Sequence, residues 1–76
     1  MAPPPIIEVA FGPVDGSNKQ YTVSAMYVPG TLQVWLNGQM KRRDFDDGWT
    51  ELGSNKFEMK VAPEVGDVVQ AWFRSL

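Results

Sequence analysis

Apolar and polar residues alternate with a period of two along most of the chain. The clearest case lies within residues 31–43, where five successive positions alternate in character: Leu32, Gln33, Val34, Trp35 and Leu36. This alternation is typical of a strand with one buried face, here formed by the three aliphatic residues. Asn37-Gly38 then supplies the two positive-φ positions of a type I′ turn. The segment therefore predicts a β-hairpin whose second strand is residues 39–43.

Five further segments show strand-like patterns. They are residues 6–11, 20–28, 49–52, 57–61 and 67–73. No window carries apolar residues at helical spacing over three turns. Seven short strands separated by turn residues predict an all-β fold, an antiparallel β-sandwich of the immunoglobulin-like or jelly-roll-like kind. We expect the second and last strands to be central.

The patterns also predict which residues face the core. On the first strand we expect Ile7, Val9 and Phe11 to point inward. On the second, the inward set is Tyr21, Val23, Ala25 and Tyr27. Pro29-Gly30 suits the centre of a type II turn, which predicts a corner where the chain crosses from one sheet to the other.

The chain divides into a short N-terminal arm, residues 1–5, and one β-sandwich domain, residues 6–76. Pro3, Pro4 and Pro5 favour an extended polyproline II conformation because each ring fixes φ and removes a backbone donor. The arm is either a disordered tail or a segment that docks on a neighbouring subunit.

Composition limits the chemistry. The 76 residues include no Cys and no His, which excludes disulfides, thiolate metal sites and a Ser-His-Asp triad. We expect no cofactor, no metal and no enzymatic activity. A chain this short buries only about 60–65% of its unfolded surface, so oligomerisation or docking onto a larger body is the support that remains.

Charge also narrows the classes of partner. The net charge is −2, and the basic residues are scattered apart from Lys41-Arg42-Arg43, so the chain lacks the basic stripe of a nucleic-acid binder. No apolar run approaches the length of a membrane helix, and the first residues do not resemble a signal peptide. The basic run is either protection of an edge strand against pairing or a contact for an acidic partner surface or a phosphate.

The acidic loop that follows resembles a calcium site only superficially. Asp44, Asp46 and Asp47 lie within four residues, but an EF-hand frame fails because its sixth position is Trp49 rather than Gly. We interpret the loop as structural: Asp44 caps the end of the edge strand and Phe45 pins it to the core.

Turn chemistry recurs before the last strand. Gly66 allows a tight turn there, and Asp67 caps the loop through its carboxylate.

Several aromatic residues are candidates for contacts rather than core packing. Trp35 and Trp72 fall on the faces opposite the expected core faces of their strands. They form either a second packed face, a protein–protein interface or a platform for stacking sugars, the last with Trp49 as a further member. The candidate interface residues are Pro3, Pro4, Pro5, Tyr27, Trp35 and Trp72.

The order of these features resembles a small β-sandwich module of virion proteins in tailed bacteriophages. The features span residues 12–73 and are, in order, Val34 to Gly38, Asp44-Phe45, a strand from Trp49, Phe57 to Val61, Ala62-Pro63 and Gly66 to Val69. Phe45 stands where Tyr is commoner. The resemblance implies a β-sandwich, structural duties for the turn residues and no catalytic residues.

By this resemblance the protein is a capsid decoration, head-spike, neck, tail or fibre subunit. It implies a virion protein made in the host bacterial cytoplasm, a homo-oligomer bound to capsid, portal, neck or tail proteins. Two alternatives are a carbohydrate-binding module for a host surface glycan, built on exposed Trp residues, and a host-directed phage inhibitor.

Overall fold

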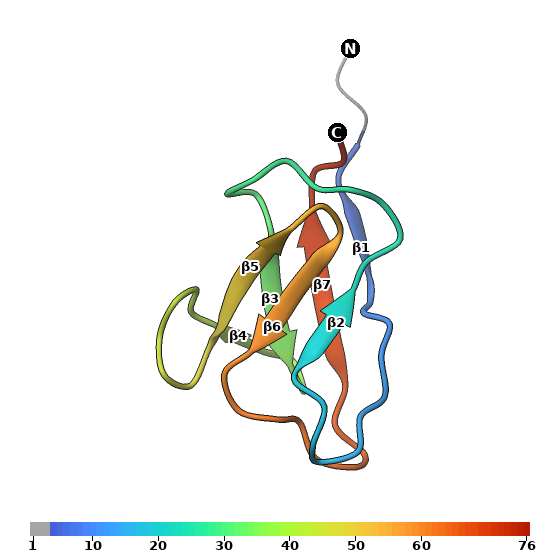
Figure 1. The fold of residues 1–76 in the computed structure, drawn as a ribbon. Helices are drawn as coiled ribbons and strands as arrows, with labels where there is room; N and C mark the ends of the chain where they lie inside the picture. Colours follow the sequence, from blue (N-terminus) through green and yellow to red (C-terminus); the bar gives the residue numbers. More distant parts are fainter. Residues whose placement is uncertain (1–3) are drawn as a thin grey trace.

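The computed structural model describes residues 4–76, which form seven strands in two antiparallel sheets. The strands are β1 (Ile6–Val9), β2 (Gln20–Thr22), β3 (Gln33–Leu36), β4 (Gln39–Lys41), β5 (Trp49–Gly53), β6 (Lys56–Met59) and β7 (Val69–Phe73). One sheet has the order β1-β7-β3-β4 and the other β2-β6-β5, and the two lie face to face (Figure 1). The predicted seven-stranded β-sandwich is confirmed.

The described part of the predicted N-terminal arm consists of Pro4 and Pro5. Pro4 and Pro5 are exposed and precede β1, whereas Pro3 of the predicted arm lies outside the described residues. Docking of this arm on a neighbour stays a prediction.

The last strand is central, but the second is not. β7 lies between β1 and β3, whereas β2 lies at the edge of its sheet, beside β6. Beyond Thr22 the chain leaves the ladder and follows the β5–β6 turn, where the Val23 and Tyr27 amides donate to Asn55 O and Ser54 O. The apolar second half of the predicted strand therefore covers a hairpin end instead of extending a sheet.

Both predicted turns of the central region are present. Asn37 and Gly38 have φ of 52° and 82°, as a type I′ turn requires. Gly30 has φ of 85°, and the Thr31 amide donates to Val28 O at 3.1 Å, as in a type II turn. This second turn carries the chain from β2 in one sheet to β3 in the other, so the predicted corner is confirmed.

Isolated bridges join the two sheets at both flanks. Phe11 pairs with Thr22 between the ends of β1 and β2, and Arg43 pairs with Trp49 between β4 and β5. The Phe11 amide donates to Thr22 O at 2.8 Å, and the Asp44 amide donates to Trp49 O at 2.6 Å. The sandwich is thus partly closed at its edges, which reduces the backbone left unpaired there.

The core lies between the sheets and contains residues from both. Its buried members are Ala10, Tyr21, Val23, Tyr27, Leu32, Val34, Trp49, Phe57, Met59, Val69, Ala71 and Phe73. Phe57 is the aromatic centre, since the Tyr21 ring stacks on it at 5.9 Å and the Trp49 ring meets it edge-on at 6.3 Å. The inward faces predicted for residues 20–28 and 32–36 are confirmed.

The inward face predicted for the first strand is wrong. Ile7, Val9 and Phe11 are 66%, 56% and 55% exposed, whereas Ala10 is buried and Ile6 packs against the core. Both faces of this strand carry apolar residues, so local alternation did not distinguish them. Pairing with β7 decides, because it places Ile7 beside Trp72 and Glu8 beside the buried Ala71.

Glu8, which now faces inward at the sheet edge, is paired. Its carboxylate accepts hydrogen bonds from the Ser24 amide at 3.2 Å and from the Ser24 hydroxyl. This acid therefore ties β1 to the segment after β2 without an unsatisfied buried charge.

Candidate binding surfaces

The outer side of the four-stranded sheet carries a largely apolar surface. Two cross-strand rows build it: Ile7, Trp72 and Gln33, then Val9, Gln70, Trp35 and Met40. We refer to these seven residues as the outer face. Ile7, Val9 and Met40 are more than half exposed, and the remaining four are partly buried by their neighbours.

The outer face contains no acidic or basic residue. The nearest charge along β7 is Arg74, whose guanidinium lies 5.9 Å from the Trp72 ring centroid. Contact with another apolar surface would therefore desolvate mainly aliphatic and aromatic groups and two amides, with the Arg74 guanidinium at the margin beside Trp72. Such a composition is typical of the centre of a protein interface.

The structure places two of the predicted contact residues on the same surface and buries a third in the core. Trp35 and Trp72 lie on the outer face on neighbouring strands, β3 and β7. Tyr27 is a correction: it is 2% exposed and its ring packs edge-on against Phe73, so it offers no contact surface. Trp49 is buried as well, which withdraws it from the predicted sugar platform.

Sequence reasoning missed three members of the outer face. Alternation predicts inward positions for Ile7 and Val9 and does not single out Met40. The strand pairing identifies them, because residues paired directly across neighbouring strands point to the same side of the sheet. Ile7 pairs with Trp72, Met40 pairs with Trp35, and Val9 pairs with Gln70, which itself pairs with Trp35.

The predicted turn and cap residues join into one network. The Asn37 side-chain amide donates to Asp67 Oδ1 at 2.9 Å, and the Val68 amide donates to Asn37 Oδ1 at 2.8 Å. The other Asp67 oxygen accepts from the Glu64 amide at 2.8 Å, and Gly66 has φ of 95°. Hydrogen bonds from Asn37 and then Glu64 lower the pKa of the Asp67 carboxyl. The capping role predicted for Asp67 is confirmed, and it reaches the β3–β4 turn.

The loop between β4 and β5, residues 42–48, projects from the sandwich at one flank (Figure 1). Phe45 is 52% exposed there, so the prediction that it pins the strand to the core is wrong. Its ring instead lies under the Arg42 guanidinium, 5.1 Å from the centroid. The core position nearby is already filled by Trp49, whose indole N–H donates to Lys41 O at 3.1 Å.

Asp44 does not act as a side-chain cap. Its φ of 63° turns the chain out of the β4 direction, and its backbone amide makes the bond to Trp49 O. The Asp44 carboxylate lies 3.7 Å from the Arg43 guanidinium. The loop closes with a bond from the Gly48 amide to Phe45 O at 3.0 Å.

A cavity of about 490 Å³ opens beside this loop. It is lined by Gly30, Leu32, Gln33, Met40, Lys41, Arg42, Arg43, Phe45 and Trp49. We refer to it as the β4 cavity. Buried Leu32 and Trp49 contribute apolar walls, and the three consecutive basic residues contribute its positive charge.

The basic residues of the β4 cavity differ in their partners. Arg43 lies 3.7 Å from the carboxylates of both Asp44 and Glu51. Glu51 also accepts a hydrogen bond from the Gly30 amide at 2.9 Å, so the Arg43–Glu51 pair is anchored. Within residues 4–76, Lys41 and Arg42 make no ion pair.

Clusters of metal-ligating side chains are a further kind of site to consider. Among the described residues, no group of three His, Cys, Asp or Glu side chains could hold a metal ion. The same part of the chain contains no helix long and apolar enough to cross a membrane.

Comparisons with protein-family models, with curated proteins and with solved structures gave no match.

Proposed function

We propose that the chain is a non-enzymatic structural subunit of a tailed-phage virion that acts by binding other proteins. In this proposal it is a capsid decoration, head-spike, neck, tail or fibre subunit, and it associates with further copies of itself. The observation that carries the binding role is the outer face, an uncharged sheet surface with more than half-exposed Ile7, Val9 and Met40. The virion assignment rests on the sequence resemblance.

An uncharged face suits contact between identical copies. In a two-fold interface, the residues near the axis meet copies of themselves, so any charge there would face a like charge. The outer face avoids this repulsion although the whole chain carries a net charge of −2.

The free energy available from this face is modest. Burying one Val, Ile or Met side chain fully contributes about 1.5–3 kcal/mol, and these three are already partly covered. The three aliphatic side chains and two partly buried Trp rings would then contribute about 5–7 kcal/mol. Association costs about 4–15 kcal/mol in lost freedom of motion, so a single contact is weak. Repetition of the contact around a symmetric particle raises the overall affinity through avidity.

The first test measures the mass of the chain in solution by light scattering from 1 to 200 µM. We expect oligomers whose fraction rises with concentration, and we expect the double variant Ile7→Glu, Met40→Glu to be monomeric. Val65→Glu is the matched control, because Val65 is 78% exposed but lies in the β6–β7 connection, away from the outer face. A monomer at every concentration would refute self-association through this face.

The second test addresses the virion. Tagged chain is mixed with purified capsids and with purified tails of tailed phages, and bound protein is measured after sedimentation. We expect saturable binding to one particle class, reduced at least tenfold by the same double variant. Equal binding of the wild type and the double variant would show that docking does not use the outer face, and absence of binding to either particle would contradict the virion role.

A specific arrangement also favours the carbohydrate-binding alternative. Trp72 lies directly across from Gln33, and Trp35 lies directly across from Gln70. An aromatic face beside an amide can stack on a sugar ring and hydrogen-bond to its hydroxyls. Tryptophan fluorescence on titration with host surface glycans tests this; we expect a saturable change that Trp35→Ala removes if the outer face binds sugars.

A further inference from the structure

We propose that the β4 cavity binds an acidic peptide segment of a partner protein. In this arrangement an apolar side chain of the segment enters the cavity, and neighbouring carboxylates bind Lys41 and Arg42. The site lies at the edge of the sandwich and uses residues that the outer face does not contain, apart from Gln33 and Met40. It is independent of the proposed function.

The apolar part of the cavity is held rigidly. Trp49 is 2% exposed, donates its indole N–H to Lys41 O at 3.1 Å and meets Phe57 edge-on. Leu32 is 4% exposed and belongs to the same core. A wall built from core residues keeps its shape without a ligand, so little ordering cost is added on binding. A volume of about 490 Å³ is ample for one aliphatic or aromatic side chain.

The charge of the cavity is positive where no internal acid neutralises it. Arg43 is paired with Asp44 and Glu51, whereas Lys41 and Arg42 have no carboxylate partner within residues 4–76. The Arg42 guanidinium lies over the Phe45 ring, 5.1 Å from its centroid, a cation–π contact that uses none of its N–H donors. Carboxylates are suitable acceptors for both cations.

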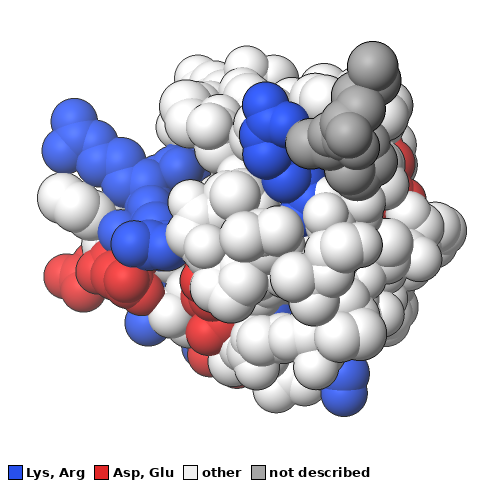
Figure 2. Space-filling view, turned by 90° about the horizontal axis from the view of Figure 1, so that it is seen from above, with Lys and Arg blue, Asp and Glu red and all other residues white. Residues whose placement is uncertain are grey.

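The acidic residues of the same loop argue for a peptide over a nucleic acid. Asp44, Asp46 and Asp47 follow the basic run directly, and Asp47 lines an adjoining hollow with Lys41 and Arg42. In Figure 2, blue and red atoms gather together on the flank where the β4–β5 loop projects. A nucleic-acid backbone carries a negative charge at every nucleotide, so some of its phosphates would be repelled by these carboxylates. A peptide can instead place one or two carboxylates beside the cations and an apolar side chain in the cavity.

The test uses the whole chain and a fluorescein-labelled octapeptide in which Glu alternates with Leu and Phe, with binding followed by fluorescence anisotropy. The same peptide with Gln in place of Glu, a labelled dT12 oligonucleotide and inorganic phosphate as competitor serve as comparison ligands. We expect binding of the Glu peptide only, weakened at least fivefold between 50 and 300 mM NaCl because the contact is ionic.

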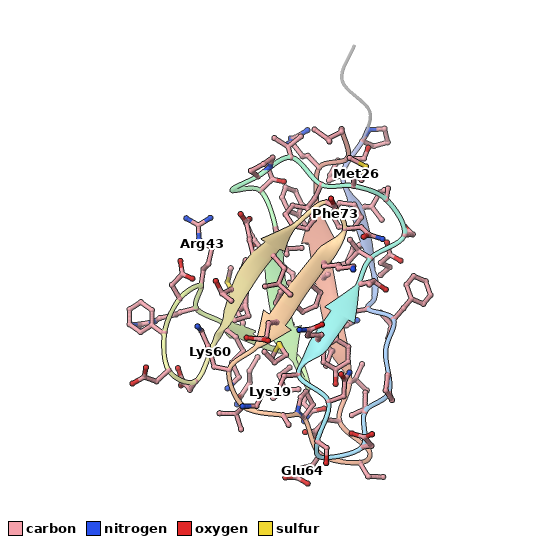
Figure 3. All side chains as sticks on the ribbon, viewed as in Figure 1. Lys19, Met26, Arg43, Lys60, Glu64 and Phe73 are labelled. Atoms are coloured by element: carbon pink, nitrogen blue, oxygen red, sulfur yellow. The ribbon has the colours of Figure 1, made fainter. Side chains whose placement is uncertain are left out.

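Variants locate the binding. Lys41→Gln with Arg42→Gln should reduce affinity for the Glu peptide at least tenfold, whereas Lys19→Gln should change it less than twofold. Lys19 is exposed and does not line the β4 cavity, and Figure 3 shows it apart from Arg43. Urea denaturation of each variant checks that it folds, and Ile7→Glu should leave peptide affinity unchanged, which separates this site from the outer face.

Four results of the direct binding measurements would overturn the proposal. These are no binding of the Glu peptide, equal binding of the Gln peptide, equal affinity of the Lys41/Arg42 variant, and tighter binding of dT12 than of the peptide. In the last case the cavity would be a phosphate site on a nucleic acid. Displacement of the Glu peptide by millimolar inorganic phosphate would likewise identify a general anion site and contradict peptide recognition.

Discussion

The hydroxyl of Tyr27 offers the sharpest test of how this sandwich is stabilised. Tyr27 follows β2, yet its hydroxyl donates to Lys56 O at 2.6 Å and accepts from the Gly53 amide at 3.2 Å. One phenol therefore satisfies a donor and an acceptor at the two ends of the β5–β6 turn. We predict that Tyr27→Phe destabilises the fold although it keeps the buried ring.

The magnitude follows from the two bonds. Each hydrogen bond contributes about 0.5–1.5 kcal/mol net, so losing both costs about 1–3 kcal/mol. A 76-residue domain has a free energy of unfolding of about 4–11 kcal/mol. The expected loss of about 2 kcal/mol is thus a large share of the total and lowers Tm by about 8–16 °C.

Tyr21→Phe is the matched control. Tyr21 is as deeply buried as Tyr27, at 1% against 2% exposure, so both substitutions remove a hydroxyl from a similar environment. The Tyr21 hydroxyl, however, has only two carbonyl acceptors, Pro13 O at 3.2 Å and Asn18 O at 3.5 Å. Its single hydrogen can serve only one of them well, so we expect a loss of about 0.5–1 kcal/mol.

The assay is urea denaturation followed by tryptophan fluorescence, with the free energy of unfolding extrapolated to water at a common m-value. Tyr27→Phe should lose at least 1 kcal/mol more than Tyr21→Phe. Equal losses would show that the two hydrogen bonds of the Tyr27 hydroxyl contribute no more than the single good bond of the Tyr21 hydroxyl, and would refute the reasoning.

Two further predictions concern a glycine and an acid. Gly48→Ala should destabilise the fold by about 3 kcal/mol or more, because the added Cβ would overlap the Arg42 carbonyl. Gly53→Ala places its Cβ in open space and should cost only about 1–2 kcal/mol, for the positive φ at that position. Urea denaturation compares the two variants, and equal losses of stability would show that the loop around Gly48 relaxes. Asp67 binds a proton less readily when folded, so its stabilisation is complete above its ordinary pKa of 3.8 and is lost as pH falls through the lowered folded pKa. Asp67→Asn should therefore flatten the decline of Tm measured below pH 4, and an unchanged acid profile would show that other carboxyls govern it.

Much of the local structure was predictable because its causes are local. Strand-like patterns located six of the strands, and the Asn37-Gly38 turn implied β4 as the second strand of its hairpin. Asn37-Gly38 and Pro29-Gly30 specified their turns through the φ values that only certain residues adopt. The same parity placed Trp35 and Trp72 outside the core, which is the part of the candidate surface that the sequence could predict.

The remaining features depend on contacts between residues far apart in the chain. Both faces of residues 6–11 carry apolar side chains, so only pairing with β7 decided that Ile7 and Val9 join Trp72 on the outer face. The hydrogen bond between Asn37 and Asp67, thirty positions apart, has no local signature either.

The sequence by itself thus determined where strands and turns form, since backbone preference and alternation act over a few residues. Tertiary structure decided which apolar side chains are buried where both faces of a segment are apolar, as in residues 6–11, and where two rings compete for one core position. Trp49 filled the core position beside β4 and left Phe45 outside under Arg42, because a core position accepts one large ring and not two.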